Sequence, residues 1–209
     1  MVVLGVTGGL GSGKSTVTRM FHQLGAVAVD ADALAHEVIE PERPAWREIV
    51  TAFGREILNA DRTINRRRLG AIVFADARRR RRLEAIVHPR VLRELRRLLR
   101  RLREERRAPV VVVEVPLLFE AGARGAVDAV VVVTAPPAVR RARLQRHGWS
   151  KREVAARMAA QWTLSAKAAL ADYIVENAAG KARTRAQVKR IWNQLGPYNN
   201  RSTPRTLSR

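Results

Sequence analysis

A glycine-rich segment near the start of the chain has the spacing of a phosphate-binding loop. Residues 5–16 read GVTGGLGSGKST, and the apolar run VVLGV at residues 2–6 leads into them. The positions Gly8, Gly13, Lys14 and Ser15 fit the pattern G-x-x-x-x-G-K-[ST] completely. In such a loop the backbone N–H groups surround a phosphate, and glycines let the phosphate approach the main chain. The segment therefore predicts a nucleotide site, whereas the alternative is a glycine turn formed by chance.

The residues of this loop are expected to divide the work of holding a nucleotide. Backbone N–H groups of the loop would bind the β-phosphate, and the start of the following helix would add the positive end of its dipole. The Lys14 ammonium would reach the β- and γ-phosphate oxygens, and the Ser15 hydroxyl would bind Mg²⁺. The predicted nucleotide-binding residues are Gly11, Ser12, Gly13, Lys14, Ser15 and Thr16.

The pattern identifies nucleotide binding more sharply than it identifies a reaction. The chain contains no N-K-x-D segment for guanine selection and no L-S-G-G-Q-like segment of a transporter ATPase, and it is too short for a helicase. The remaining interpretation is a small kinase that moves the γ-phosphoryl group of ATP to a small acceptor.

Two carboxylates follow the second apolar segment and are candidates for the acceptor side. Asp30 and Asp32 end the stretch GAVAVDAD at residues 25–32, which reads as a short strand. In an extended segment alternate residues share a face, so both carboxylates would look into one cleft, although a turn after Asp30 would separate them. A carboxylate there would accept the proton of an attacking hydroxyl or bind Mg²⁺ through water. The alternative is that they cap a helix that begins near residue 33.

Length and charge limit the class of protein. The 209 residues suffice for one domain, and cysteine is absent. No apolar stretch approaches the roughly 20 residues that cross a bilayer. We therefore expect a cytoplasmic protein without a membrane association. The formal net charge is +21, and nearly all of the basic residues are arginines. This charge favours polyanionic partners, but runs such as RELRRLLRRLREERR at 93–107 also fit the wet face of an amphipathic helix.

The order of apolar runs predicts an α/β fold. Strands are expected at 2–6, 25–32, 109–115, 129–133 and 173–175, with helical segments at about 15–24, 33–107, 136–170 and 181–194. The runs PVVVVEV and AVVVV are continuous rather than alternating, which suits a parallel sheet covered on both faces. We predict a doubly wound parallel sheet of the P-loop NTPase type, with ligands bound beyond the carboxyl ends of its strands.

Several further segments resemble the dephospho-coenzyme A kinase family. The likeness is carried by GVTGGLGSGKSTV, VDADALAHEV, FGREIL followed by INRRRL, LEAIVHPRV, EVPLLFEAG, AAQ and ADYIVEN, in this order, between residues 2 and 177. The resemblance implies transfer of the γ-phosphoryl group of Mg-ATP to the ribose 3′-hydroxyl of dephospho-CoA. It also implies a P-loop nucleoside-monophosphate-kinase-like domain with a helical CoA subdomain and a lid.

The resemblance implies roles for particular residues. Asp32 would be the general base, and Lys14 and Ser15 would keep the roles given above. Thr7 would lie beside the acceptor, although it also reads as an ordinary threonine at a strand end. Arg66 would contact the phosphates of the acceptor, although the neighbouring Arg67 and Arg68 make its register ambiguous. The other residues implied to line the acceptor site are His88 and the apolar Pro116, Leu117 and Leu118, for which structural roles are the alternative.

Two positions depart from the family pattern. Glu114 stands where many members have an aspartate before the proline, and its longer side chain would hold Mg²⁺ through water. The arginines of the lid segment RRARLQRHGWS at 140–150 are not spaced as in the family. Arg146 is the expected lid arginine, with Arg143 or Arg141 as its partner, because lid arginines neutralise charge on the phosphoryl group during transfer.

The resulting division of the chain is one kinase domain at 1–196. Its nucleotide-binding core would comprise 1–32, 108–136 and 171–196, the CoA subdomain 33–107 and the lid 137–170, while the polar segment 197–209 would be a flexible tail. We expect a monomer or a small homo-oligomer with dephospho-CoA and ATP as its partners. Two alternatives stay open: another P-loop nucleotide or nucleoside kinase, and a nucleic-acid-binding protein that uses the basic surface. The second lacks support, because only 5% of residues are aromatic and we expect no specific nucleic acid partner.

Overall fold

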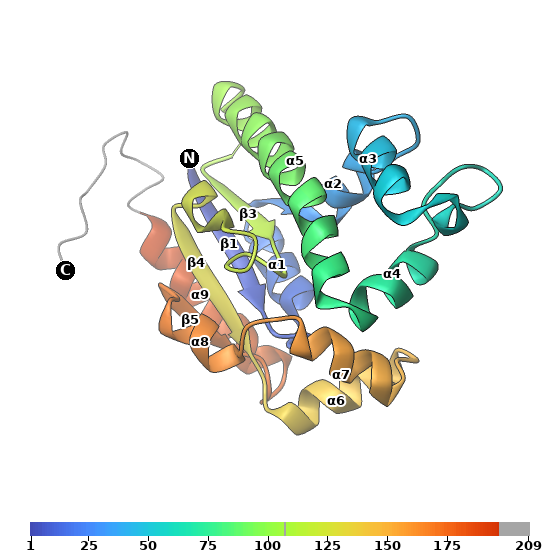
Figure 1. The fold of residues 1–209 in the computed structure, drawn as a ribbon. Helices are drawn as coiled ribbons and strands as arrows, with labels where there is room; N and C mark the ends of the chain where they lie inside the picture. The colour runs from blue at the N-terminus through green and yellow to red at the C-terminus, as the bar shows by residue number, and fades with distance from the viewer. Residues whose placement is uncertain (107, 197–209) are drawn as a thin grey trace.

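A single parallel sheet organises the chain in the computed structural model, which describes residues 1–106 and 108–196. Its five strands lie in the order β2-β3-β1-β4-β5 (Figure 1). They are β1 (Val2–Gly8), β2 (Val27–Asp30), β3 (Val110–Glu114), β4 (Ala129–Thr134) and β5 (Tyr173–Glu176). The predicted doubly wound parallel α/β sheet is confirmed. The predicted tail at 197–209 lies outside the described residues.

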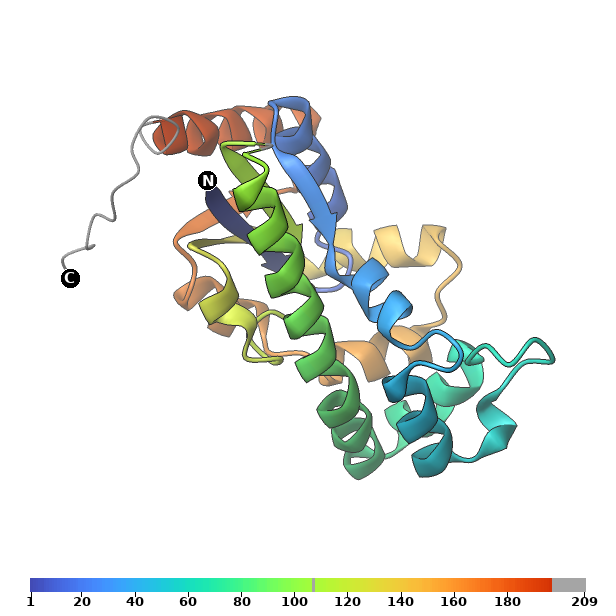
Figure 2. The same ribbon diagram turned by 90° about the horizontal axis from the view of Figure 1, so that it is seen from above.

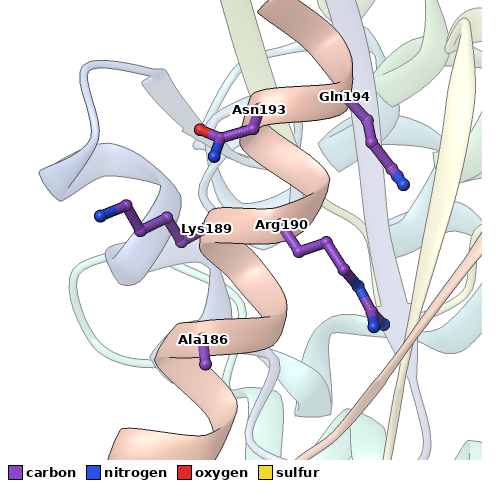
Figure 3. A pocket seen from close by; sticks show the side chains of 5 residues that line it. All are labelled: Ala186, Lys189, Arg190, Asn193 and Gln194. Carbon is purple, nitrogen blue, oxygen red and sulfur yellow. The ribbon is translucent and has the colours of Figure 1, made fainter.

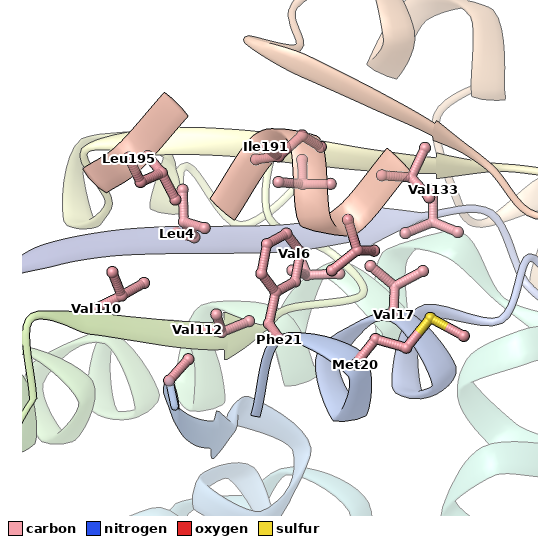
Figure 4. Close-up of a cluster of buried hydrophobic side chains, with 14 of the residues drawn as sticks. Leu4, Val6, Val17, Met20, Phe21, Val110, Val112, Val133, Ile191 and Leu195 are labelled. Carbon is pink, nitrogen blue, oxygen red and sulfur yellow. The ribbon is translucent and has the colours of Figure 1, made fainter. Parts of the chain in front are cut away.

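The central strands are buried because helices cover both of their faces. Every residue of β1 is buried, and Val110 to Val113 of β3 have no exposed surface. One face carries α1 (Lys14–Gln23) and α9 (Lys181–Leu195), whose apolar side chains meet Leu4, Val6 and Val112 of the sheet (Figure 4). A strand that is apolar on both faces fits only between two such layers, which explains the continuous valine runs.

The opposite face is covered by a second layer of helices. It consists of α5 (Ala77–Glu104), the short η2 (Ala123–Ala126) and α8 (Leu164–Ala169). Leu95, Leu99 and Leu102 of α5 pack against the sheet, and Figure 2 shows α5 on the side away from α1 and α9. The arginines between these leucines, including Arg96, Arg97 and Arg100, lie on the outer side of the helix and are exposed, as the amphipathic interpretation predicts.

The long segment between β2 and β3 forms a helical region with a core of its own. It contains α2 (Ala31–Val38), α3 (Pro44–Phe53), η1 (Arg55–Ile57), α4 (Arg66–Ala75) and the beginning of α5. Its apolar cluster is made of Trp46, Ile49, Phe53, Ile57, Ile64, Leu69 and Val73, none of which belongs to the sheet. The bounds of α3 lie where the sequence predicts breaks: the helix begins at Pro44 and ends before Gly54, whose φ is 87°.

Two helices extend from the carboxyl end of β4 toward the helical region. They are α6 (Pro137–Arg146) and α7 (Lys151–Ala159), joined by a turn at Gly148 with a φ of 77°. Ser150 begins α7 with a capping box, in which its hydroxyl accepts the N–H of Glu153 while the Glu153 carboxylate accepts the N–H of Ser150. Helix α7 reaches α4, so this pair of helices bridges the sheet and the helical region (Figure 1).

The second strand is shorter than the sequence suggested. It ends at Asp30, and Asp32 lies in the first turn of α2. The Asp30 carboxylate caps this helix by accepting the N–H of Asp32 at 2.9 Å. The expectation that both carboxylates alternate on one extended segment is therefore wrong, because the turn after Asp30 gives the two side chains different directions. Among the described residues no helix is long and apolar enough to cross a membrane.

Phe21 is the largest side chain without exposed surface, at the point where α1 meets the sheet. We expect Phe21→Ala to lower the free energy of unfolding by about 3–5 kcal/mol, since it removes buried contacts and leaves a cavity. Gln23→Ala, on the exposed side of the same helix, should change it by less than about 0.5 kcal/mol. Urea unfolding followed by circular dichroism measures both, and equal losses would contradict this account of the core.

Candidate active site

The glycine loop adopts backbone angles that only glycine accepts easily. Gly11 and Gly13 have φ values of 76° and 90°, and Gly13 is the left-handed residue that precedes α1. A Cβ atom on Gly13 would lie 2.1 Å from the Asn177 side-chain nitrogen. The loop therefore turns tightly between β1 and α1 with no room for a side chain at this point.

The carbonyl oxygens of the loop are bound from behind by two arginines and an asparagine. The Leu10 oxygen accepts the Arg140 Nε–H at 2.9 Å. The Ser12 oxygen accepts the Asn177 side-chain amide at 2.8 Å and the Arg143 guanidinium at 3.1 Å. Because the N–H and C=O of a trans peptide point in opposite directions, these bonds turn the N–H groups of Gly11 and Gly13 to the other side.

These N–H groups form an anion site at the start of α1. Within the described part of the chain, no acceptor contacts the backbone N–H of Gly11, Gly13, Lys14 or Ser15. The first N–H groups of a helix have no partner inside the helix, and its dipole is positive at this end. The loop thus offers converging donors and a positive potential, which is the environment that a nucleotide phosphate requires.

Lys14 lies over this loop in a buried position. Its ammonium donates to the Gly9 carbonyl at 3.4 Å, which is a long hydrogen bond. Burial lowers the pKa of Lys14, and the neighbouring positive charges of Lys167 and Arg140 act in the same direction, while Glu114 and Asp32 oppose them. A side chain held among other cations at such a site is suited to a polyanionic ligand.

Asp32 is the carboxylate that the environment perturbs. Burial raises the pKa of Asp32 above 3.8, and the negative charge of Asp30 raises it further. Lys14, His36 and Arg157 partly offset these effects by favouring the ionised form. Asp32 and Lys14 each affect the other's pKa, so the carboxylate lies near the phosphate loop, where a general base for an attacking hydroxyl is needed.

Ser15 and Glu114 provide adjacent oxygen atoms at the edge of the sheet. The Ser15 hydroxyl donates to the Glu114 carboxylate at 2.8 Å. The register of the sheet places Glu114 opposite both Val6 of β1 and Asp30 of β2, at the carboxyl ends of the strands. Among the described residues no cluster of three metal-binding side chains occurs. This donor set nevertheless fits Mg²⁺, which proteins commonly hold through one or two oxygen ligands together with substrate phosphates and water.

Arg66 is directed toward α2 and the acceptor side. Its guanidinium contacts the His36 ring, and His36 lies one helical turn after Asp32. Arg68, in contrast, donates to the carbonyl oxygens of Glu56 and Leu58. The ambiguity of the sequence register is thereby reduced, since Arg68 has structural partners and Arg66 contacts His36 on α2.

Other residues implied by the resemblance lie in different environments. Leu118 has no exposed surface and packs in the sheet core, so its predicted contact with the acceptor is wrong for this structure. Thr7 is also fully buried, and its hydroxyl donates to the Pro116 carbonyl at 3.3 Å, which is the ordinary structural role considered as the alternative. Leu117 and His88 are half-buried, and burial lowers the pKa of His88.

The two arginines expected in the lid differ in their contacts. The Arg143 guanidinium is engaged with the carbonyl oxygens of Gly11, Ser12 and Asn177, at 3.4, 3.1 and 2.7 Å. Arg146 is exposed and donates only within its own helix, to the Ala142 carbonyl. Arg143 thus supports the loop from behind, and the catalytic role expected for Arg146 stays a prediction.

Three residues of the site lay beyond the sequence interpretation. Arg140, Asn177 and His36 contact the loop or Arg66 from segments remote in sequence. Asn177 has the clearest signal in the sequence, because it directly follows the last strand. The carboxyl end of that parallel strand lies at the same edge of the sheet as the loop. Arg140 could not be distinguished within an arginine-rich stretch.

The most evident surface hollows lie elsewhere. One is lined by Ala186, Lys189, Arg190, Asn193 and Gln194, all from the outer side of α9 (Figure 3). A hollow formed by a single helix has no opposing wall and cannot enclose a nucleotide. The chemistry of the loop, and not this hollow, therefore locates the candidate active site.

Comparison with known proteins points to one family. The sequence model of dephospho-CoA kinases matches residues 2–183. The dephospho-CoA kinase of Syntrophus aciditrophicus is 44% identical over 196 residues, which are 93% of this chain and 83% of that protein. Among solved structures, TT1252 from Thermus thermophilus is 37% identical with a TM-score of 0.78, covering 93% of this chain and 97% of that one. The dephospho-CoA kinase from Campylobacter jejuni is 28% identical with a TM-score of 0.69, covering 94% and 98%.

The conformation of the loop can be tested at Gly13. We expect Gly13→Ala to weaken the binding of an ATP analogue by at least about tenfold, because the added methyl group would displace Asn177 from the Ser12 carbonyl. Gly148→Ala is the control, since Gly148 also has a positive φ but has open space around its Cα. Isothermal titration calorimetry measures both affinities. Similar losses in the two variants would show that backbone strain, rather than the clash at the loop, is responsible.

Proposed function

The chain belongs to the dephospho-CoA kinase family, and on that premise we propose that its loop and carboxylates transfer the γ-phosphoryl group of ATP to the ribose 3′-hydroxyl of dephospho-CoA. The reaction yields coenzyme A and ADP and is the last step of coenzyme A biosynthesis. The observation that carries the assignment of the site is geometric: the N–H groups of the glycine loop, unpaired among the described residues, lie at the carboxyl edge of the sheet, where Ser15 contacts Glu114 and where Asp32 and Lys14 influence each other's pKa.

The N–H groups of Gly11, Gly13, Lys14 and Ser15 bind the β-phosphate, as their unpaired state and direction support. Lys14 contacts the β- and γ-phosphate oxygens. Both interactions orient the nucleotide so that its terminal phosphorus faces the acceptor. Ser12 and Thr16, which lie in the same loop and the first turn of α1, complete the nucleotide site.

Asp32 accepts the proton of the attacking 3′-hydroxyl. The new bond joins the 3′-oxygen to the γ-phosphorus, the bond from that phosphorus to the bridging oxygen breaks, and its electron pair leaves with ADP. The raised pKa of Asp32, caused by burial and by the charge of Asp30, suits this role because a carboxylate with a higher pKa is a stronger base.

Ser15 and Glu114 would hold Mg²⁺, directly or through water, as the 2.8 Å contact between their side chains supports. When bound, the ion neutralises charge on the β- and γ-phosphate oxygens. The protein groups that surround this position keep their own tasks: Glu114 orients the Ser15 hydroxyl, and Lys14 remains beside both.

The acceptor approaches from the helical region. We assign the segment at 33–107 as the CoA subdomain, the segment at 137–170 as the lid and the remaining residues to 196 as the nucleotide-binding core. Arg66 binds phosphates of the acceptor, and its contact with His36 supports this because it places the guanidinium beside α2, the helix that carries Asp32. His88 and Leu117 are half-buried and line the acceptor side.

A substrate comparison tests this function. Purified protein is incubated with ATP and Mg²⁺ together with dephospho-CoA, AMP, CMP, dTMP or nucleosides, and ADP formation is coupled to NADH oxidation. We expect kcat/KM for dephospho-CoA to exceed that for every other acceptor by at least about 10³-fold, since binding of the remote part of the acceptor helps to orient its hydroxyl. A higher kcat/KM with a nucleoside monophosphate would instead assign the chain to another kinase activity.

Replacement of the base should separate chemistry from binding and from folding. We expect Asp32→Asn to lower kcat by about 10²–10⁴-fold while the affinity for ATP is retained, because the amide cannot accept the hydroxyl proton. The native pKa of Asp32 is raised, so the ionised carboxylate costs stability above its unfolded-state pKa, and this cost appears as pH rises.

The variant should therefore be at least as stable as the wild type at pH 7, and the difference should vanish at acidic pH, where both side chains are neutral. Steady-state kinetics and thermal unfolding measured across pH check the two statements. Near-normal turnover would remove Asp32 from the role of base, and a destabilised variant at pH 7 would contradict its unfavourable burial.

A further inference from the structure

Arg157 is held between two aromatic rings at the junction of the lid and the helical region. Its guanidinium carbon lies 4.4 Å from the centre of the Trp149 ring and 4.8 Å from that of the Phe74 ring. Trp149 belongs to the turn before α7, Phe74 to α4, and Arg157 to the last turn of α7. The two rings thus come from different parts of the fold, and Arg157 contacts both of them.

This aromatic bracket, formed by Trp149 and Phe74, fixes the position of a charge without neutralising it. A guanidinium is flat and weakly hydrated, so it tolerates contact with aromatic rings, while the N–H groups at its edge remain available to an anion. In the described part of the chain no hydrogen bond or ion pair involves the Arg157 guanidinium. Both rings attract the cation through their electron-rich faces and so hold it in place.

The charge of Arg157 reaches the predicted base. Burial and Coulombic effects from Asp30 of β2, Lys14 of α1, His36 of α2 and Arg157 of α7 together determine the pKa of Asp32. Burial lowers the pKa of Arg157, while the negative charges of Glu153 on the same helix and of Asp32 oppose this effect. Lys14 and Arg157 therefore act on the same carboxylate from separate elements, one from the nucleotide loop and one from the lid.

We propose that Arg157, positioned by Trp149 and Phe74, is the lid residue that contacts the phosphoryl group while it moves from ATP to the acceptor. This inference rests on the proposed function. During transfer the γ-phosphorus leaves the bridging oxygen of ADP and joins the acceptor oxygen, and negative charge spreads over its equatorial oxygens. Lys14 contacts these oxygens from the nucleotide side, and the N–H groups of Arg157 contact them from the acceptor side.

The other arginines of the lid are less suited to this task. Arg140 and Arg143 donate to the carbonyl oxygens of the phosphate loop and would have to abandon these bonds. Arg146 and Arg157 are both exposed, but the described residues show no ring contact for Arg146, which donates to the Ala142 carbonyl of its own helix. Arg157 alone among these residues combines unoccupied donors, a fixed position and an electrostatic influence on Asp32.

The inference also explains how acceptor and lid are coordinated. Because Phe74 is part of the helical region that we assign to the acceptor, the placement of Arg157 depends on the position of α4. The cation is thus presented in full only when lid and helical region are together. This arrangement limits transfer to water when the acceptor is absent, since an incomplete site stabilises the moving phosphoryl group poorly.

Four variants test the role of Arg157: Arg157→Ala, Arg157→Lys, Phe74→Leu and the control Lys151→Ala, which removes an exposed charge from the same helix. We expect Arg157→Ala to lower kcat by about 10³-fold with the affinity for ADP unchanged. Arg157→Lys should retain a small part of the activity, because an ammonium lacks the planar donor edge. Phe74→Leu should lower kcat by an intermediate amount although the charge remains, and Lys151→Ala should resemble the wild type.

Two further measurements distinguish catalysis from a merely structural effect. The affinity for the complex of ADP, aluminium fluoride and dephospho-CoA should fall in Arg157→Ala by about the same factor as kcat, because this complex mimics the transferring phosphoryl group. The acid limb of the kcat profile should move to higher pH, since loss of the positive charge raises the pKa of Asp32. Circular dichroism confirms that each variant is folded; if Arg157→Ala is not, Arg157→Lys and Phe74→Leu decide.

The inference is overturned if Arg157→Ala behaves like Lys151→Ala, or if it weakens ADP and the aluminium fluoride complex equally. It is also overturned if Phe74→Leu has no effect on kcat, because the bracket would then have no positioning role. Failure of the wild-type protein to phosphorylate dephospho-CoA would refute the proposed function instead, so the two outcomes are distinct.

Discussion

The orientation of a few peptide groups in the glycine loop is the constraint on which the site depends. Hydrogen bonds from Arg140, Arg143 and Asn177 hold the loop carbonyls of Leu10 and Ser12 on one side, so the N–H groups of Gly11 and Gly13 face the other. These three side chains come from α6 and from the end of β5, far from the loop in sequence. The anion site therefore exists only once the sheet has been assembled, although the loop itself is local.

This arrangement places several charged groups close together, and a bound ligand would offset their charges. Burial lowers the pKa of Lys14, and the charges of Lys167 and Arg140 lower it further, whereas burial and the charge of Asp30 raise the pKa of Asp32. The charged form of each group is therefore less stable in the free protein than it would be in water. A polyanionic nucleotide compensates the cations, and a hydroxyl that donates to Asp32 compensates the carboxylate. Local destabilisation of this kind is typical of functional sites.

The two helices that we propose as the lid have different contacts. Helix α6 is bound to the back of the phosphate loop through Arg140 and Arg143, which makes it part of the nucleotide site. Helix α7 instead contacts α4 of the helical region, and its Arg157 lies between Phe74 and Trp149. The turn at Gly148 separates the helices and allows these two attachments to coexist. A segment that reads as one arginine-rich region is thus divided into a support for the loop and a cation for the acceptor side.

The sequence alone determined the parallel sheet and the glycine loop and led to the prediction of roles for Lys14, Ser15 and Asp32, because these follow from local patterns: valine runs, a glycine motif and a carboxylate after a strand. It did not determine that β2 ends at Asp30, that Leu118 lies in the core, or that Arg68 is bound to backbone carbonyls while Arg66 faces His36. Above all, it did not separate the arginines at 140, 143, 146 and 157. Side chains of one type and equal charge differ only in the groups that surround them, and those groups are brought together by contacts between segments distant in the chain. Tertiary structure alone therefore decided which arginines support the loop and which one lies between Trp149 and Phe74.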